Sequence, residues 1–179
     1  FLDLQVAIDH MNAATVSKYL PVGIMQQDLV NWLDSAIKAG TVEQGRVSFY
    51  GRLKDFPFKR QQGAFRAHIA GRDFTIDYAP GWPGATNASL SATFDSTGMR
   101  IHADSARIKG NTIRDLDLEI RRYATPFISL TSRAKGKVSD GFRFMVSSPI
   151  APGAKDFVRQ NRLGGEYSAA IKLQIPLSE

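Results

Sequence analysis

The sequence of 179 residues contains no cysteine. This absence excludes disulfide bonds, zinc–thiolate sites and cysteine nucleophiles. No apolar run approaches the ~18 residues that a membrane-spanning helix requires. The chain begins at Phe1, without a basic-then-apolar leader. We therefore expect an internal segment of a longer protein, whose anchor or signal lies outside this chain.

Residues that could form a catalytic centre are scarce. The three histidines, His10, His68 and His102, lie at polar positions of strand-like segments. His102 and Asp104 are two residues apart and share a strand face, but no G-x-S-x-G nucleophile elbow accompanies them, so a surface contact is favoured over a hydrolase. H-E-x-x-H and EF-hand motifs are also missing. The sequence predicts a non-enzyme with no catalytic residues, no metal site and no cofactor.

The charge pattern gives no sign of a nucleic-acid partner. Lys and Arg total 23 against 17 Asp and Glu, a formal net charge of +6. Nucleic-acid binders concentrate basic residues on one helix or stripe and interleave aromatic residues. Here the basic residues are spread singly, and the aromatic residues follow the apolar pattern. Asp115, Asp117 and Glu119 alternate on one strand face near arginines, which favours cross-strand ion pairs.

Apolar residues at every second position are the main feature. Leu2, Leu4, Val6 and Ile8 begin the pattern, which continues through most of the chain after Gly40. It predicts about nine or ten strands, joined by turns too short for parallel crossovers. The phase changes at residues 71–72, which indicates a bulge. We predict a mainly β fold, one domain over residues 1–179, with a long curled antiparallel sheet that has one apolar face.

Few helices accompany these strands. A covering helix is predicted at about 24–39, where apolar residues recur at helical spacing and Gly40 follows as the C′ residue. Shorter helices are predicted over 13–20 and at about 153–161, and residues 141–147 are predicted to form a strand. A helix of ~15 residues is ~23 Å long and ~10 Å wide, whereas ten strands span ~45 Å.

The predicted apolar face therefore exceeds what these helices cover. Leaving a dozen such side chains in water would cost tens of kcal/mol at ~25 cal/mol per Å². Either the sheet rolls on itself around an ordinary core, which composition and spacing alone favour, or part of the face is a groove for an apolar ligand. The candidate groove residues are Val47, Phe49, Phe65, Ile69, Phe74, Ile76, Leu90, Phe94, Leu118, Ile120, Phe142, Phe144, Ile171 and Leu173.

Several short motifs follow one another in a fixed order over residues 20–179. They are Leu20-Pro21, Leu29-Val30-Asn31-Trp32-Leu33, Gly40-Thr41-Val42, Tyr50-Gly51-Arg52-Leu53-Lys54-Asp55-Phe56-Pro57-Phe58, Gly63-Ala64-Phe65, Pro80-Gly81-Trp82-Pro83, Ser105-Ala106-Arg107, Ser148-Pro149-Ile150, Gly164-Gly165 and Ile175-Pro176-Leu177. Each motif alone is weak evidence, but the ordered set is specific. With these motifs the sequence resembles the YhdP family of AsmA-like bacterial proteins.

The resemblance implies a long repeating β-groove that is anchored in the inner membrane and extends across the periplasm. The expected function is that of a non-enzymatic, periplasmic lipid-conduit segment, tethered to the inner membrane by an anchor outside this chain. It would move phospholipid toward the outer membrane and support the outer-membrane barrier, with acyl chains on the apolar face. Its expected partners are phospholipid and neighbouring segments of the longer chain. The alternative is a periplasmic structural domain that assembles by sheet-edge pairing and carries no lipid.

Overall fold

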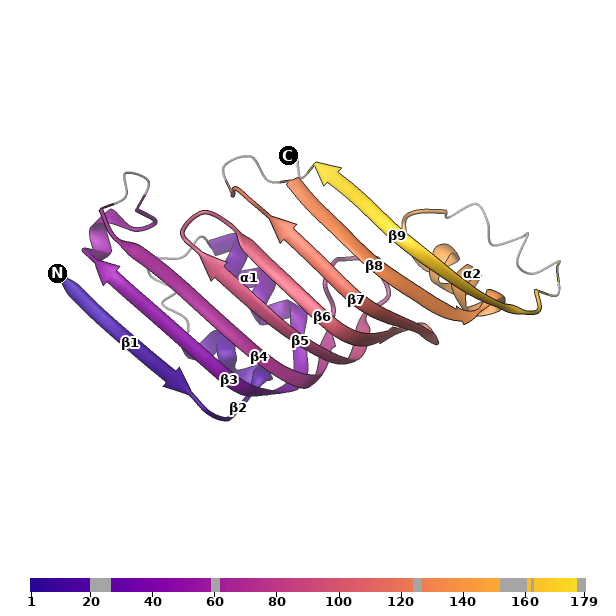
Figure 1. Ribbon diagram of the computed structural model, residues 1–179, viewed down its shortest axis with the longest axis horizontal. Helices are drawn as coiled ribbons and strands as arrows, with labels where there is room; N and C mark the ends of the chain where they lie inside the picture. The colour runs from indigo at the N-terminus through magenta and orange to yellow at the C-terminus, as the bar shows by residue number, and fades with distance from the viewer. Residues whose placement is uncertain (20–26, 59–61, 124–126, 152–160, 162, 177–179) are drawn as a thin grey trace.

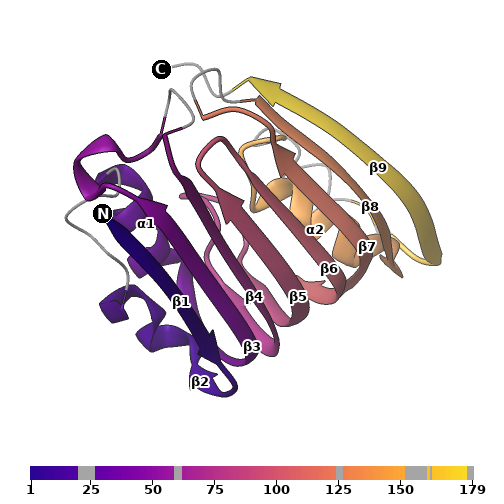
Figure 2. The same ribbon diagram turned by 60° about the vertical axis from the view of Figure 1, so that its left-hand side comes forward.

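One open antiparallel sheet dominates the computed structural model, which describes residues 1–19, 27–58, 62–123, 127–151, 161 and 163–176. The strand order is β1-β3-β4-β5-β6-β7-β8-β9, and the short β2 pairs with β3 (Figure 1). β1 and β9 lie at the two edges, so the sheet is not closed into a barrel. The sheet is twisted and curled (Figure 2). The predicted mainly β fold with a curled antiparallel sheet is confirmed.

The described chain contains nine strands and four short helices. The strands are β1 (Leu2–Ile8), β2 (Met11–Asn12), β3 (Ile37–Gly51), β4 (Ala64–Ile76), β5 (Ala85–Asp95), β6 (Met99–Ile108), β7 (Asn111–Ile120), β8 (Phe127–Lys137) and β9 (Glu166–Pro176). The helices are η1 (Ala13–Tyr19), α1 (Gln27–Ala36), η2 (Leu53–Asp55) and α2 (Val138–Val146), of which η1 and η2 are 3₁₀-helices.

Tight turns and bulges shape the sheet. Lys109 and Gly110 both have positive φ, and this two-residue turn matches the right-handed twist of the strands that it joins. The predicted bulge is confirmed, because the pairing of β4 with β5 shifts register between Gly71 and Phe74. Only glycine fits at position 71, since a Cβ there would overlap the carbonyl oxygen of Thr41. The bulge changes which side chains face the apolar side of the sheet. Odd-numbered residues of β4 up to Gly71 face that side, and Phe74 and Ile76 face it after the bulge.

The helix predicted at about 24–39 ends earlier than predicted. α1 ends at Ala36, and Ile37 already pairs with Ile76 as the first residue of β3. The carbonyl oxygen of Ala36 accepts a hydrogen bond of 2.8 Å from the backbone N–H of Asp77, which ties the end of the helix to the end of β4. Sheet pairing therefore overrides the helical spacing after residue 36. The part of the predicted helix before residue 27 lies outside the described residues, as does nearly all of the helix predicted at 153–161.

The strand predicted over residues 141–147 is wrong. This segment belongs to α2, so Phe142 and Phe144 project from a helix and not from the sheet. The sequence fits both periods here, because the two phenylalanines alternate while Val138, Phe142 and Val146 recur every fourth residue. Asp140 in the first turn favours the helix through the helix dipole.

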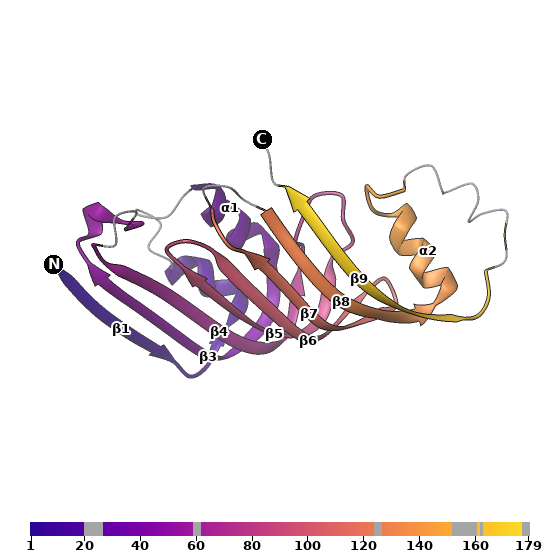
Figure 3. The ribbon, with the colours of Figure 1, turned by 45° about the horizontal axis from the view of Figure 1, so that its top comes forward.

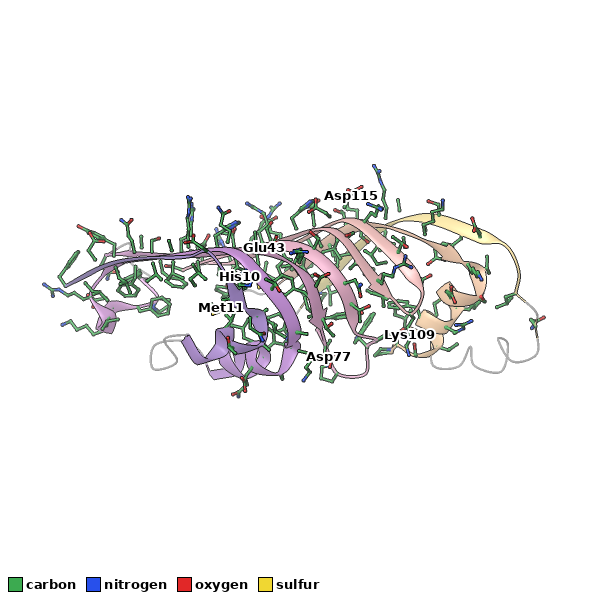
Figure 4. The ribbon with its side chains drawn as sticks, turned by 90° about the horizontal axis from the view of Figure 1, so that it is seen from below. His10, Met11, Glu43, Asp77, Lys109 and Asp115 are labelled. Atoms are coloured by element: carbon green, nitrogen blue, oxygen red, sulfur yellow. The ribbon has the colours of Figure 1, made fainter. Side chains whose placement is uncertain are left out.

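The helices cover one end of the strands on one face. The buried core beneath them contains Ala13, Val42, Phe74, Ala85, Ala88, Ala106, Ile113 and Ala134. α1 and η1 lie on that face in Figure 4, whereas Glu43 and Asp115 point to the opposite side of the sheet. Many of these core residues are alanines, whose small side chains leave room for the covering elements to approach the strands.

An aromatic bridge joins the covering elements. Trp32 of α1 donates a hydrogen bond from Nε1 to the carbonyl oxygen of Tyr78, at 3.0 Å. The ring of Tyr78 lies 6.3 Å from that of Trp82, which in turn lies 6.1 Å from Phe144 of α2. Burial raises the pKa of Tyr78 to about 12. α1 and α2 lie apart along the sheet, with α2 beside the ends of β8 and β9 (Figure 3), so the loop before β5 connects them.

Candidate functional site

Two unbroken apolar rows cross the sheet beyond its covered end. The strand register places each member of a row directly opposite the next member on the neighbouring strand. The first row is Val6, Val47, Ala67, Phe94, Met99, Ile120, Ile128 and Ile175. The second row is Ile8, Gly45, Ile69, Ala92, Ile101, Leu118, Leu130 and Leu173. We call these two rows together the open strip.

Most side chains in the open strip are partly accessible to solvent. At the two edges of the sheet, Val6 is 40% exposed and Ile175 is 39% exposed. Between them, Phe94, Met99 and most of the other large members are half-buried. In the described part of the chain, the main contacts of α1 are with η1 and β3, and those of α2 are with β8. The sheet thus presents an apolar surface that these two helices leave largely uncovered.

The predicted groove residues divide among four places. The open strip contains Val47, Ile69, Phe94, Leu118, Ile120 and Leu173. The covered end contains Phe74, Ile76, Leu90 and Ile171, and Ile69 lies at the boundary, where it also packs against the core. Phe49 and Phe65 lie at the β3–β4 rim against other aromatic rings, and Phe142 and Phe144 lie on α2. The structure therefore brings together only part of the predicted set.

The prediction also missed members of the open strip. Ala67, Met99, Ile101, Ile128 and Leu130 belong to the two rows but were not among the candidate residues. Their alternation with polar neighbours is visible in the sequence, but it does not show which residues share a row. Only the strand pairing shows which residues share a row: Phe94 pairs with Met99, and Leu118 pairs with Ile101 and Leu130.

The opposite face of the sheet is charged. Arg100 pairs with Glu119, Arg133 pairs with Asp115 at 3.4 Å, and His102 pairs with Asp117. These contacts join neighbouring strands, so the cross-strand ion pairs predicted for the three carboxylates of β7 are confirmed. Exposed pairs of this kind contribute little stability individually, but they keep this face in water. The sheet is consequently amphipathic, with its apolar face on the side of the helices.

His102 lies on this charged face between two carboxylates. Its Nδ1 is 2.8 Å from Oδ1 of Asp117, and its Nε2 is 3.5 Å from Oδ1 of Asp104. The hydrogen bond with Asp117 raises the pKa of His102 above 6.5, against an opposing effect of burial, and the charges of Asp117 and Asp104 add to the increase. Because both ring nitrogens face carboxylates, neither is directed at a serine or threonine nucleophile. The geometry favours a surface ion pair, as the sequence predicted.

Replacing Asp117 with asparagine is expected to lower the pKa of His102 toward its ordinary value, because the principal partner of the imidazolium loses its charge. An NMR titration of the His102 ring measures this change. Asp115→Asn on the same strand is the control and should leave the His102 titration unchanged. Since the pKa is raised in the folded state, the pair stabilises the protein below pH ~6.5 and loses that effect as the pH rises through the folded-state pKa. An identical His102 titration curve in the two variants would contradict the assignment of Asp117 as the principal partner of His102.

Comparisons with known proteins agree on one family. The model of a family described as "YhdP protein" matches residues 1–179. The chain is 23% identical over 178 residues to a protein of Escherichia coli (strain K12) named "Intermembrane phospholipid transporter YhdP". The match covers 99% of the chain and 14% of that relative, so the chain spans about one seventh of the relative's length. No solved structure matches the chain.

None of the described helices has the length and hydropathy needed to cross a membrane. Among the described residues, no group of three or more histidine and carboxylate side chains is arranged to hold a metal ion.

Proposed function

The chain belongs to the YhdP family, and we propose that its open strip holds the acyl chains of phospholipid as one segment of a lipid path between two membranes. The observation that supports this function best is the continuity of the two apolar rows across eight strands. The name of the E. coli relative, which specifies phospholipid transport, supports the same ligand class.

The proposed mechanism is physical and requires no catalytic residue. Each methylene group that leaves water contributes ~0.8 kcal/mol, so an acyl chain is held by contact area without specific hydrogen bonds. The charged headgroup stays in water, because burying it without partners would cost far more than the contact provides. Since the first row offers an apolar side chain on every strand, a tail can move from strand to strand with a small change in free energy.

In this proposal the segment lies in the periplasm and is tethered to the inner membrane by another part of a longer chain. β1 and β9 each have one edge without a strand partner in the described residues. Such edges are templates for further strands, so neighbouring segments would continue both rows. These long edges also support the alternative function, a structural domain that assembles by edge pairing and carries no lipid.

Photo-crosslinking distinguishes the two functions. A benzoylphenylalanine at Phe94, in the first row, is expected to capture phospholipid in bacterial cells. Tyr50 is the matched control, because it is an exposed aromatic residue whose neighbours in sequence, Phe49 and Gly51, face the apolar side. Mass spectrometry of the crosslinked peptide identifies the adduct. Equal lipid capture at Phe94 and Tyr50, or capture at neither position, counts against lipid binding by the open strip.

A further inference from the structure

Four phenylalanine rings meet at the rim where β3 and β4 are joined. Phe56 and Phe58 come from the connection that contains η2, and Phe49 and Phe65 come from the two strands. The Phe58 ring lies 5.3 Å from Phe49, and the Phe56 ring lies 5.6 Å from Phe65 in an edge-to-face arrangement. We call Phe56 and Phe58 the aromatic lip.

The lip lies on the apolar face of the sheet. Phe49 pairs with Leu4 and Phe65. On their strands these three residues lie two positions from Val47, Val6 and Ala67 of the first row, on the same face of the sheet. A Cβ on Gly51, which follows in the same alternation, would come within 2.6 Å of Cε1 of Phe58. Figure 4 shows the η2 connection on the same side of the sheet as α1. The lip therefore stands beside the open strip, across it from the helix-covered end.

The rings pack tightly enough to close this rim. Phe49, near the end of β3, is 4% exposed, and Phe58, in the connection, is 5% exposed. Phe58 also has a φ of 61°, a costly conformation for a bulky residue that persists only where the surroundings fix it. Phe56 is half-buried and its ring contacts those of Phe49, Phe58 and Phe65, so it covers part of the surface of Phe49.

The dimensions of the strip restrict how a tail can lie in it. On β4 the uncovered part runs from Phe65, against the lip, to Ile69, against the core. Four residues of a strand cover only about 13 Å. A single acyl chain occupies about 15 Å, half of the ~30 Å hydrocarbon core of a bilayer. Across the sheet, the path contains eight strands and extends about 34 Å.

We propose that the aromatic lip is the side wall that confines phospholipid acyl chains to the open strip and directs them across the strands. This role rests on the proposed function. A tail laid along β4 would have to displace either the lip or the helix-covered core, whereas a tail laid across the strands meets an apolar side chain of the first row on every strand. Phe56 is the ring that contacts the other three, so its removal uncovers Phe49.

The test maps where a photoreactive tail contacts the chain. The probe is phosphatidylcholine in vesicles, with a diazirine either at the middle or near the end of one acyl chain, and peptide mass spectrometry locates the label. In the unaltered protein both probes should label residues of the two rows, on different strands, and leave Phe49 and Phe58 at background. In Phe56→Ala, label on Phe49 should rise from background to the level found on Phe94. Phe56→Leu, which keeps part of the wall, should give an intermediate yield and provides a second variant if the alanine variant does not fold.

Phe127→Ala is the control, because it removes an exposed phenylalanine adjacent in sequence to the row residue Ile128. This variant should keep the labelling pattern of the unaltered protein. Equal labelling of Phe49 and Phe94 in the unaltered protein would overturn the proposed role of the lip as a side wall, although lipid binding by the open strip would still stand. Labelling of Phe94 but not Phe49 in both Phe56 variants does the same. Absence of label from both rows overturns the proposed function itself.

Discussion

Replacing Leu118 with aspartate is expected to remove bound phospholipid from the chain. Leu118 is an interior member of the second row, where it pairs with Ile101 and Leu130. A tail lying there would have to desolvate the new carboxylate, which costs several kcal/mol without a partner. That cost offsets the contact of several methylene groups at ~0.8 kcal/mol each. Native mass spectrometry of the purified variant measures the loss.

The matched control places the same charge on the other face of the same strand. Thr112 of β7 pairs with Arg107 and Lys135, so an aspartate at this position meets basic neighbours in water. Thr112→Asp should retain as much lipid as the unaltered chain. Because Leu118 is only half-buried, both variants should keep a cooperative unfolding transition. Equal lipid content in the two variants would place the lipid somewhere other than the open strip.

Replacing Phe74 with alanine is expected to destabilise the fold by about 3–5 kcal/mol. Phe74 is 1% exposed and belongs to the core under the helices. Its ring lies over Gly40, where a Cβ would come within 2.9 Å of Cδ1 of Phe74, so the surrounding backbone is closely fitted to it. Urea unfolding followed by tryptophan fluorescence measures the change in the free energy of unfolding.

Phe127→Ala provides the comparison for this measurement, since Phe127 is 42% exposed. Surface substitutions of this kind usually change stability by less than about 0.5 kcal/mol. A loss at Phe74 no larger than that at Phe127 would show that the covered end is not a packed core. The boundary between core and open strip would then have to be redrawn.

The alternation of apolar residues predicted the strands well, because a period of two has one physical meaning in a sheet with one wet face. The same alternation could not separate core from open surface. Phe74 and Phe94 occupy equivalent positions in the pattern, yet only Phe74 belongs to the core cluster. That cluster includes Ala13, which is distant in sequence, so tertiary packing decides which phenylalanine is buried.

The spacing of apolar residues also gave wrong predictions in two situations. In one, a segment fits both the helical period and the strand period; in the other, sheet pairing competes with a helix. Phe142 and Phe144 alternate like strand residues, but their segment forms α2 and packs against Trp82 through Phe144. Ile37 continues the apolar stripe of α1, but it pairs with Ile76 in the sheet. Both segments contact residues that are distant in the sequence, and the sequence alone does not reveal these contacts.

The rows of the open strip were not predictable from alternation alone, because they depend on the register of every strand pair. Gly71 indicated the bulge that fixes part of this register, since the phase changes beside it. The joint position of Val6 and Ile175 in one row follows only when all the pairings between them are known. The excess of apolar face over predicted helix cover raised the possibility of a groove, the family resemblance implied one, and the register specifies the residues that form the proposed surface.

The most direct test of lipid binding is native mass spectrometry of the unaltered 19.7 kDa chain, produced in the bacterial periplasm and purified in mild detergent. The expected spectrum contains the chain with bound phospholipid, which fragmentation of the ejected ligand identifies. A spectrum with only the lipid-free chain, even after incubation with phospholipid vesicles, would contradict the claim that the open strip holds acyl chains.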